Sequence, residues 1–201
     1  MARTGRPRAF DTEQALSGAR DLFWSRGYGA TSIQDLVDEL KVQRGSLYAA
    51  FGDKRGLYLQ AVALYARQNR QRLEALLDTD PVLPTIRQML LDPATLTGAP
   101  ELPNGERRGC LVGNTAAELL PEDKAAGELV AAAYQTTVEV LTAALQRAQS
   151  AGEVTTNATP QAQAQLLLLL LQGAALVGRA QPDRDLFAGG VDAAINALRA
   201  L

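Results

Sequence analysis

Residues 31–58, TSIQDLVDELKVQRGSLYAAFGDKRGLY, decide the fold of this chain. Apolar residues at Ile33, Leu36, Val37 and Leu40 recur at the spacing of one helical face. This pattern predicts a short helix that buries one side and leaves the other side polar.

The flanks of this helix predict how it begins and how it ends. Thr31 and Gln34 form the pattern of a capping box. The connection Lys41-Val42-Gln43 leads into Arg44–Phe51, which repeats the apolar spacing. Two short helices joined this tightly are typical of a helix-turn-helix, whose second helix fits the DNA major groove. Spacing alone would favour an ordinary helical hairpin, so the outward-facing residues must decide.

The outward face of the second helix carries Arg44, Gly45, Ser46, Tyr48 and Ala49. Arginine can bind guanine edges through two hydrogen bonds, serine can reach a base or a phosphate, and glycine permits close approach. These residue types favour DNA recognition over a simple hairpin.

The next helix is expected to begin with a cap and two cations. Asp53 caps it, and Lys54 and Arg55 are its first residues. A helix start with free N–H groups and cations is a natural phosphate site.

With these residues in view, the stretch from Phe10 through Leu59 resembles the TetR/AcrR family of bacterial transcriptional repressors, above all in RGSLYAAFGDKRGLY. The resemblance implies a helix-turn-helix DNA-binding domain of three helices at residues 10–55. It also implies a helical ligand-binding and dimerisation domain at residues 56–201. By the same resemblance, phosphate contacts would come from Thr31, Ser32, Tyr48 and Lys54, and base contacts from Arg44, Gly45 and Ser46.

Three positions depart from the family pattern. Ala50 replaces a common His or Tyr, Lys41 stands where the turn usually has Gly, and Gln43 stands where a Ser or Thr cap is usual. A left-handed Lys41 would cost about 1 kcal/mol relative to glycine.

Charge is sorted along the chain. The net charge is −2, yet residues 1–55 hold nine Lys/Arg against seven Asp/Glu, and residues 56–201 hold eleven against fifteen. The basic part thus coincides with the predicted DNA-binding domain. The polar, basic N-terminus is no secretory signal, and a single cysteine fits a reducing cytoplasm.

The chain contains no histidine and one cysteine, which argues against an enzyme. Catalytic triads, imidazole metal sites and a zinc cluster within one chain are excluded, and we predict no catalytic residue, metal or cofactor. Glu122 and Asp123 could form a carboxylate pair, but a solvated helix start is the simpler interpretation.

The remaining pattern predicts an all-α chain. Trp24, beside the inner face of the first predicted helix, is expected to lie in the protein core. Residues 92–109 are expected to be irregular and are a candidate lid. The predicted helices outside the helix-turn-helix span residues 11–26, 54–77, 85–91, 110–119, 122–151, 160–179 and 182–201.

The last two helices are the predicted homodimer interface. LLLLLLQGAALVG, residues 166–178, is apolar on every side, and Gly173 and Gly178 would let a partner helix approach. A buried pair of core helices is the alternative. Dimerisation is favoured because a DNA-binding protein with one recognition helix per chain needs two copies to specify a long enough DNA site. The family resemblance likewise implies a four-helix bundle across the dimer. The run Leu166–Leu171 is too short to span a membrane.

A small hydrophobic effector is expected in the C-terminal domain, in a mostly apolar pocket with a few polar anchors. The candidate lining residues are Tyr65, Gln68, Met89, Cys110, Asn114, Glu118, Tyr134, Thr137 and Gln172.

Cys110 has two interpretations. The segment GCLVGNTAAELL resembles a stretch in a branch of the family, some of whose members respond to electrophiles. A helix start preceded by Arg107 and Arg108 favours a reactive thiolate. The preferred interpretation is a small residue that packs at the start of a helix.

The N-terminal arm, residues 1–9, carries Arg3, Arg6 and Arg8 and is expected to be disordered without DNA. It is either a solubilising tail or a reader of an A·T-rich minor groove. For the whole chain, the alternatives to an effector-released repressor are an architectural DNA-binding protein and a helical enzyme or carrier.

Overall fold

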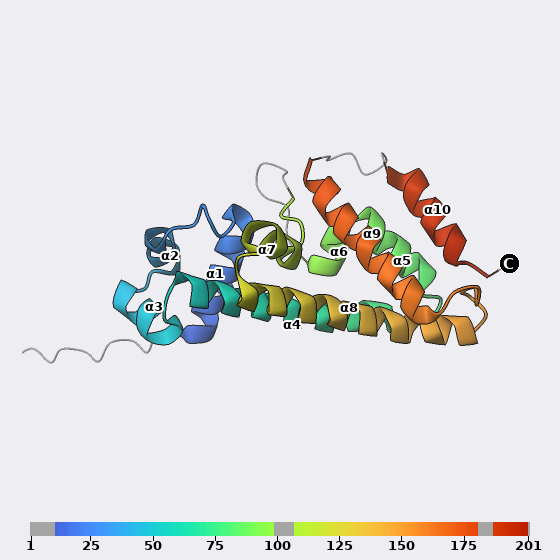
Figure 1. Cartoon of the computed structure of the whole chain (residues 1–201), viewed down its shortest axis with the longest axis horizontal. Coiled ribbons are helices and arrows are strands. Elements are labelled where there is room, and N and C mark those ends of the chain that lie inside the picture. The colour runs from blue at the N-terminus through green and yellow to red at the C-terminus, as the bar shows by residue number, and fades with distance from the viewer. Residues whose placement is uncertain (1–10, 99–106, 181–186, 201) are drawn as a thin grey trace, which may run out of the picture. The chain divides into compact units, whose positions relative to one another are not determined.

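The computed structural model describes residues 11–98, 107–180 and 187–200 (Figure 1). Over these residues the chain forms ten helices and no strand, so the prediction of an all-α fold is confirmed. The chain divides into two compact units, and the division falls inside α4 (Lys54–Leu77), between Leu64 and Tyr65. The domain limits 10–55 and 56–201 stay a prediction.

The first unit holds α1 (Thr12–Arg26), α2 (Ile33–Leu40), α3 (Arg44–Phe51) and the first part of α4. Asp11 caps α1 by accepting from the N–H groups of Glu13 and Gln14, each at 3.0 Å. Trp24 is buried, as the sequence predicts.

Close packing joins α1 to α2. A Cβ on Gly18 would lie 2.5 Å from Leu40 Cδ2, so any larger residue here would require the Leu40 side chain to shift. Leu36 of α2 is completely buried, while Ile33, Val37 and Leu40 are half-buried. The predicted apolar face of α2 is therefore the face that packs.

The turn between α2 and α3 has the predicted length. Lys41 ends α2 in the left-handed conformation, with φ 53° and ψ 41°, and its N–H donates to the carbonyl of Val37. Gln43 precedes α3 without a side-chain cap, although its carbonyl accepts from the N–H of Ser46 at 2.9 Å. Both departures from the family pattern are thus visible in the backbone.

The second unit holds the rest of α4 and six further helices, with a shared hydrophobic core. Leu141 and Leu145 of α8 and Leu167 and Leu171 of α9 lie at its centre. The six helices are α5 (Leu83–Leu91), α6 (Pro93–Thr97), α7 (Leu111–Leu119), α8 (Lys124–Ser150), α9 (Pro160–Ala180) and α10 (Ala188–Leu198). Helix α9 packs against α8, and Figure 1 shows α9 running obliquely to α8, with the start of α9 near the end of α8.

Helix α5 begins two residues before the predicted start at residue 85. The carboxylate of Glu153 accepts from the N–H groups of Val82 and Leu83, at 2.8 and 2.7 Å. This remote acceptor caps the helix, and Pro84 then lies in the first turn, where its missing N–H is not needed.

The prediction that residues 92–109 are irregular was wrong for α6. Asp92 caps this short helix by accepting from Ala94 N at 3.2 Å, and Pro93 is its first residue. The guanidinium of Arg72 donates to the carbonyls of Leu96 and Thr97 at its end. Residues 99–106, the centre of the expected lid, lie outside the described residues.

Helix α8 begins at Lys124, and Asp123 caps it by accepting from Ala126 N at 2.9 Å. This contact confirms the helix-start interpretation of Asp123.

Helix α10 begins at Ala188, later than residue 182, and Phe187 before it is exposed. Arg87 of α5 binds Asp192 of α10 with an N–O distance of 2.6 Å. The hydrogen bond from Arg87 holds the pKa of Asp192 below its usual value. This ion pair and the buried Ile195 and Leu198 attach α10 to the core.

By length and composition alone, the whole of α9 is apolar enough to cross a membrane. Its run of six leucines, the only part considered from the sequence, is too short to do so. The helix packs on α8 instead, with Gln163 and Ala164 buried as well as its core leucines. Its composition is therefore that of a helix with one face in the core.

Candidate functional site

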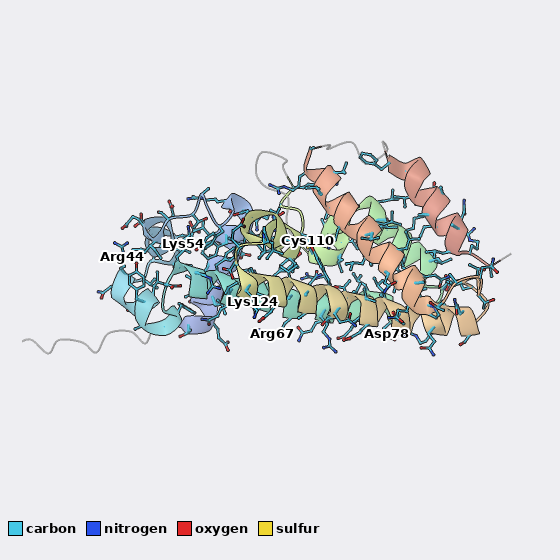
Figure 2. All side chains as sticks on the ribbon, viewed as in Figure 1. Arg44, Lys54, Arg67, Asp78, Cys110 and Lys124 are labelled. Atoms are coloured by element: carbon cyan, nitrogen blue, oxygen red, sulfur yellow. The ribbon has the colours of Figure 1, made fainter. Side chains whose placement is uncertain are left out.

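The exposed face of α3 carries the residues that were predicted to contact bases. Leu47 and Phe51 are buried beneath it, whereas Arg44 and Gly45 are exposed and Ser46 is half-buried. Figure 2 shows Arg44 on this helix. Burial of one side of α3 fixes the direction in which the opposite side points, so the helix presents these residues to solvent.

Arg44 and Tyr48 form a pair on this face. The guanidinium lies 5.8 Å from the centre of the Tyr48 ring, and the tyrosine is 41% exposed. The two residues are one helical turn apart, which allows an arginine to lean on the ring. Tyr48 therefore supports Arg44 and is itself exposed on this face.

The capping box at the start of α2 involves different residues from those predicted. Ser32 caps the helix, its hydroxyl accepting from Asp35 N at 3.0 Å, and Asp35 accepts from Ser32 N at 2.7 Å. The hydrogen bond with the Ser32 hydroxyl contributes most to lowering the pKa of the Asp35 carboxyl. The predicted pair Thr31 and Gln34 was wrong by one residue.

Thr31 lies inside the unit. Its side chain is completely buried, and its hydroxyl donates to the carbonyl of Gly27 at 2.7 Å. Ser32 is exposed. Of the two residues expected to bind phosphate here, Ser32 alone presents its side chain to solvent.

The start of α4 brings together a cap, a cation and a tight turn. Asp53 accepts from Gly56 N at 2.6 Å through Oδ1, and a Cβ on Gly56 would lie 2.4 Å from the carbonyl oxygen of Phe51. Glycine is therefore required for α3 and α4 to meet at this angle. Lys54, labelled in Figure 2, places its ammonium 4.3 Å from the centre of the Tyr28 ring.

Sequence reasoning missed Gly56 and Tyr28. Neither follows from a helical spacing. Gly56 meets Phe51 across the turn between α3 and α4, and Tyr28, in the connection between α1 and α2, meets Lys54 at the start of α4. Arg3, Arg6 and Arg8 of the arm lie outside the described residues.

In the second unit, three of the predicted effector residues, Tyr65, Tyr134 and Gln172, lie around the thiol of a fourth, Cys110. Cys110 is the residue before α7, and its Sγ accepts from Gln172 Nε2 of α9 at 3.7 Å. Gln172 Oε1 in turn accepts from the hydroxyl of Tyr134 on α8 at 3.4 Å. Burial is the main cause that raises the pKa of the Tyr134 hydroxyl to about 12, and the nearby Cys110 adds to it. The same two causes raise the pKa of the Tyr65 hydroxyl well above its usual value. Both phenols are therefore protonated donors at neutral pH.

Gly113 allows this gathering. A Cβ at position 113 would lie 2.7 Å from Gln172 Oε1 and 3.7 Å from Cys110 Cβ. A larger residue at position 113 would require the Gln172 side chain to shift. No local sequence pattern reveals this requirement.

The other predicted effector residues are engaged elsewhere. Met89 is completely buried in the hydrophobic core, and the hydroxyl of Thr137 donates to the carbonyl of Ala133. Asn114 accepts from Arg179 and donates to the carbonyl of Arg108, each at 3.1 Å. Glu118 is exposed and Gln68 is half-buried.

Two grooves lie on the second unit, and the predicted effector residues line neither of them. One, of about 560 Å³, lies between α4 and α8 and carries charged groups such as Arg70, Glu74 and Glu139. The other, of about 500 Å³, is largely apolar and lies among α5, α9 and α10, with Leu169 and Val177 on one wall.

Comparison with known proteins decides the family. Residues 15–61 match the bacterial regulatory proteins of the tetR family, and residues 100–194 match the tetracyclin repressor-like C-terminal domain. The chain belongs to the TetR family. Its members are transcriptional regulators and not enzymes, so the prediction that the chain has no catalytic function agrees with its family.

Relatives extend the likeness beyond the helix-turn-helix. The transcriptional repressor BdcR of Escherichia coli K12 is 37% identical over 109 residues, 54% of this chain and 53% of BdcR. The chain thus spans about half the length of that relative. The repressor ComR of the same organism is 27% identical over 175 residues, 87% of this chain and 82% of ComR.

A solved structure of the TetR-family regulator CifR, a cysteine mutant complexed with a 26-base-pair double-stranded operator, resembles the whole chain. The TM-score is 0.77 at 27% identity, covering 96% of this chain and 100% of CifR.

Proposed function

We propose that this protein is a one-component transcriptional repressor, a homodimer that binds a palindromic operator and is released by a small effector. The observation that carries the proposal is the exposed face of α3, with Arg44, Gly45 and Tyr48 above a buried helix-turn-helix core. The complex of CifR with its operator supports the same role for a chain of this family.

The contacts with DNA fall into two groups. Arg44, Gly45 and Ser46 read base edges, since they lie on the first turn of α3. Ser32, Tyr48 and Lys54 bind phosphates and set the register of the helix on the duplex. Thr31 supports the turn through its hydrogen bond to Gly27, and does not contact DNA through its buried hydroxyl.

The dimer forms through α9 and α10. Leu169 and Leu176 are 70% and 66% exposed, and they are two helical turns apart on α9, so they lie on one side of it. A Cβ on Gly173 between them would meet no atom within 4 Å, which leaves room for a partner helix. The exposed apolar residues of this surface are Leu166, Leu169, Leu176, Val177 and Phe187. An apolar surface of this kind is typical of a site of association.

The effector acts at the cluster of Cys110, Tyr65, Tyr134 and Gln172, and its class is a small apolar or electrophilic molecule. Cys110 offers this effector a nucleophile, and Gln172 and the two phenols surround the thiol with polar groups. Helix α4 starts among the DNA-binding residues and carries Tyr65, so it couples the cluster to the DNA contacts. A regulator of this kind works in the cytoplasm, where its DNA lies.

Selection of duplexes from a random pool tests the DNA part of the proposal. A palindromic consensus, bound by two chains per duplex, supports it. Binding without sequence preference favours an architectural protein instead, and the absence of DNA binding refutes the proposal.

Alkylation tests the effector part. N-ethylmaleimide should release the operator from the native protein but leave Cys110→Ser bound. Release that persists in Cys110→Ser, or no release at all, would leave Cys110 with its packing role alone.

A further inference from the structure

The residue of interest is Tyr28, which lies in the connection between α1 and α2. Its ring supports the ammonium of Lys54, at 4.3 Å from the ring centre. This distance is well inside the range in which a cation is attracted by the face of an aromatic ring.

Tyr28 is itself held by the core of the first unit. Its ring centre lies 4.8 Å from that of Tyr58, and Tyr58 meets Phe23 edge to face at 4.9 Å. Tyr58 and Phe23 are completely buried. The ring below Lys54 therefore has a fixed place on the packed core.

A fixed ring changes what the lysine can do. A free lysine side chain loses much rotamer entropy when it is ordered on a phosphate. An ammonium has three N–H donors, and the ring face occupies one side of it, so donors remain for a phosphate. A lysine held over the ring is ordered before DNA arrives.

We propose that Tyr28 is a positioning residue that orders Lys54 for its contact with a DNA phosphate. The inference rests on the proposed function, because it takes the start of α4 as a phosphate site. Tyr28 does not touch DNA in this account but acts through Lys54. A ring that instead withheld the ammonium from DNA would weaken binding, and its removal would then strengthen it.

A double-mutant cycle tests the proposal, with four variants: Tyr28→Leu, Tyr28→Phe, Lys54→Gln and the double variant Tyr28→Leu/Lys54→Gln. Affinity for the selected operator and for a scrambled duplex is measured at several salt concentrations. A further variant with trifluorophenylalanine at position 28 keeps the shape of the ring but weakens its attraction for a cation. It keeps the test valid if Tyr28→Leu does not fold.

Tyr28→Leu and the fluorinated variant should weaken binding to both duplexes about two- to fivefold, the range of an exposed cation–π contact. Tyr28→Phe should bind like the native protein. With Lys54→Gln, the leucine substitution should have no further effect. An equal loss with and without Lys54, or tighter binding by the fluorinated variant, would overturn the proposal. Failure of the native protein to select any operator would instead refute the proposed function.

Discussion

Replacing Arg44 by alanine should remove sequence preference from this protein more than it removes affinity for DNA in general. Arg44 is exposed on the first turn of α3. A pair of hydrogen bonds from arginine to one guanine discriminates between bases by about 1–3 kcal/mol.

The contact with Tyr48 reduces this loss. The guanidinium lies 5.8 Å from the ring centre in the free protein, a distance at which an exposed cation–π contact contributes about 0.5–1 kcal/mol. If Arg44 leaves the ring to reach the base, the protein loses this cation–π energy on binding. The net contribution of Arg44 to the free energy of DNA binding is smaller by the same amount. We therefore expect Arg44→Ala to weaken operator binding by about 0.5–2 kcal/mol, about two- to thirtyfold.

The assay is a titration of labelled operator and of a scrambled duplex of the same composition. Arg44→Ala should lose affinity for the operator and retain most of its affinity for the scrambled duplex. Arg67→Ala is the matched control, because Arg67 is an exposed arginine in the second unit and should leave both affinities unchanged (Figure 2). An equal loss on both duplexes for Arg44→Ala would refute the assignment of this residue to base recognition.

Two further outcomes follow from the structure, and a third follows from the sequence of the N-terminal arm. Lys41→Gly should raise the free energy of unfolding by about 1 kcal/mol in chemical denaturation, since φ is 53° at this position, whereas Lys41→Ala should not. Leu176→Glu should shift the protein from dimer to monomer in analytical ultracentrifugation, while Gln14→Glu on α1 should not; a dimeric Leu176→Glu would place the interface elsewhere. Deletion of residues 2–8 should weaken operator binding and reduce the preference for flanking A·T pairs without changing dimerisation. A purely salt-dependent loss would make the arm an electrostatic tether.

The helix-turn-helix could be predicted because its determinants are local. The apolar spacing of α2 and α3, the length of their connection and the glycine after α1 all act within a few residues. The capping box was misplaced by one residue because Thr31 and Ser32 are both good caps. The difference arises from Gly27, whose carbonyl accepts from Thr31 and draws its side chain inside.

The second unit was harder to predict because its determinants are remote in sequence. The start of α5 depends on Glu153, about seventy residues away, and the end of α6 is held by Arg72. A local signal for α6, an aspartate followed by proline at residues 92–93, was present but was interpreted as irregular chain.

The effector-binding role of the candidate residues stays a prediction, but the structure shows which of them lie together. Tyr65, Cys110, Tyr134 and Gln172 were chosen individually as polar or aromatic groups on the C-terminal helices, and the fold brings these four together. Gly113 was missed, because its role depends on how closely α7 approaches Gln172 of α9. Met89 was wrongly grouped with polar anchors, since its side chain fills the core.

The central claim is that α3 reads the major groove of a two-fold operator, and methylation interference at guanine N7 tests it most directly. Guanine N7 lies in the major groove, where an arginine would bind it. Methylation within each half-site should block binding of the native protein, symmetrically about the centre. In Arg44→Ala, one guanine in each half-site should lose this effect while the others keep it. Interference confined to adenine N3 in the minor groove, or an identical pattern for Arg44→Ala and the native protein, would contradict the account.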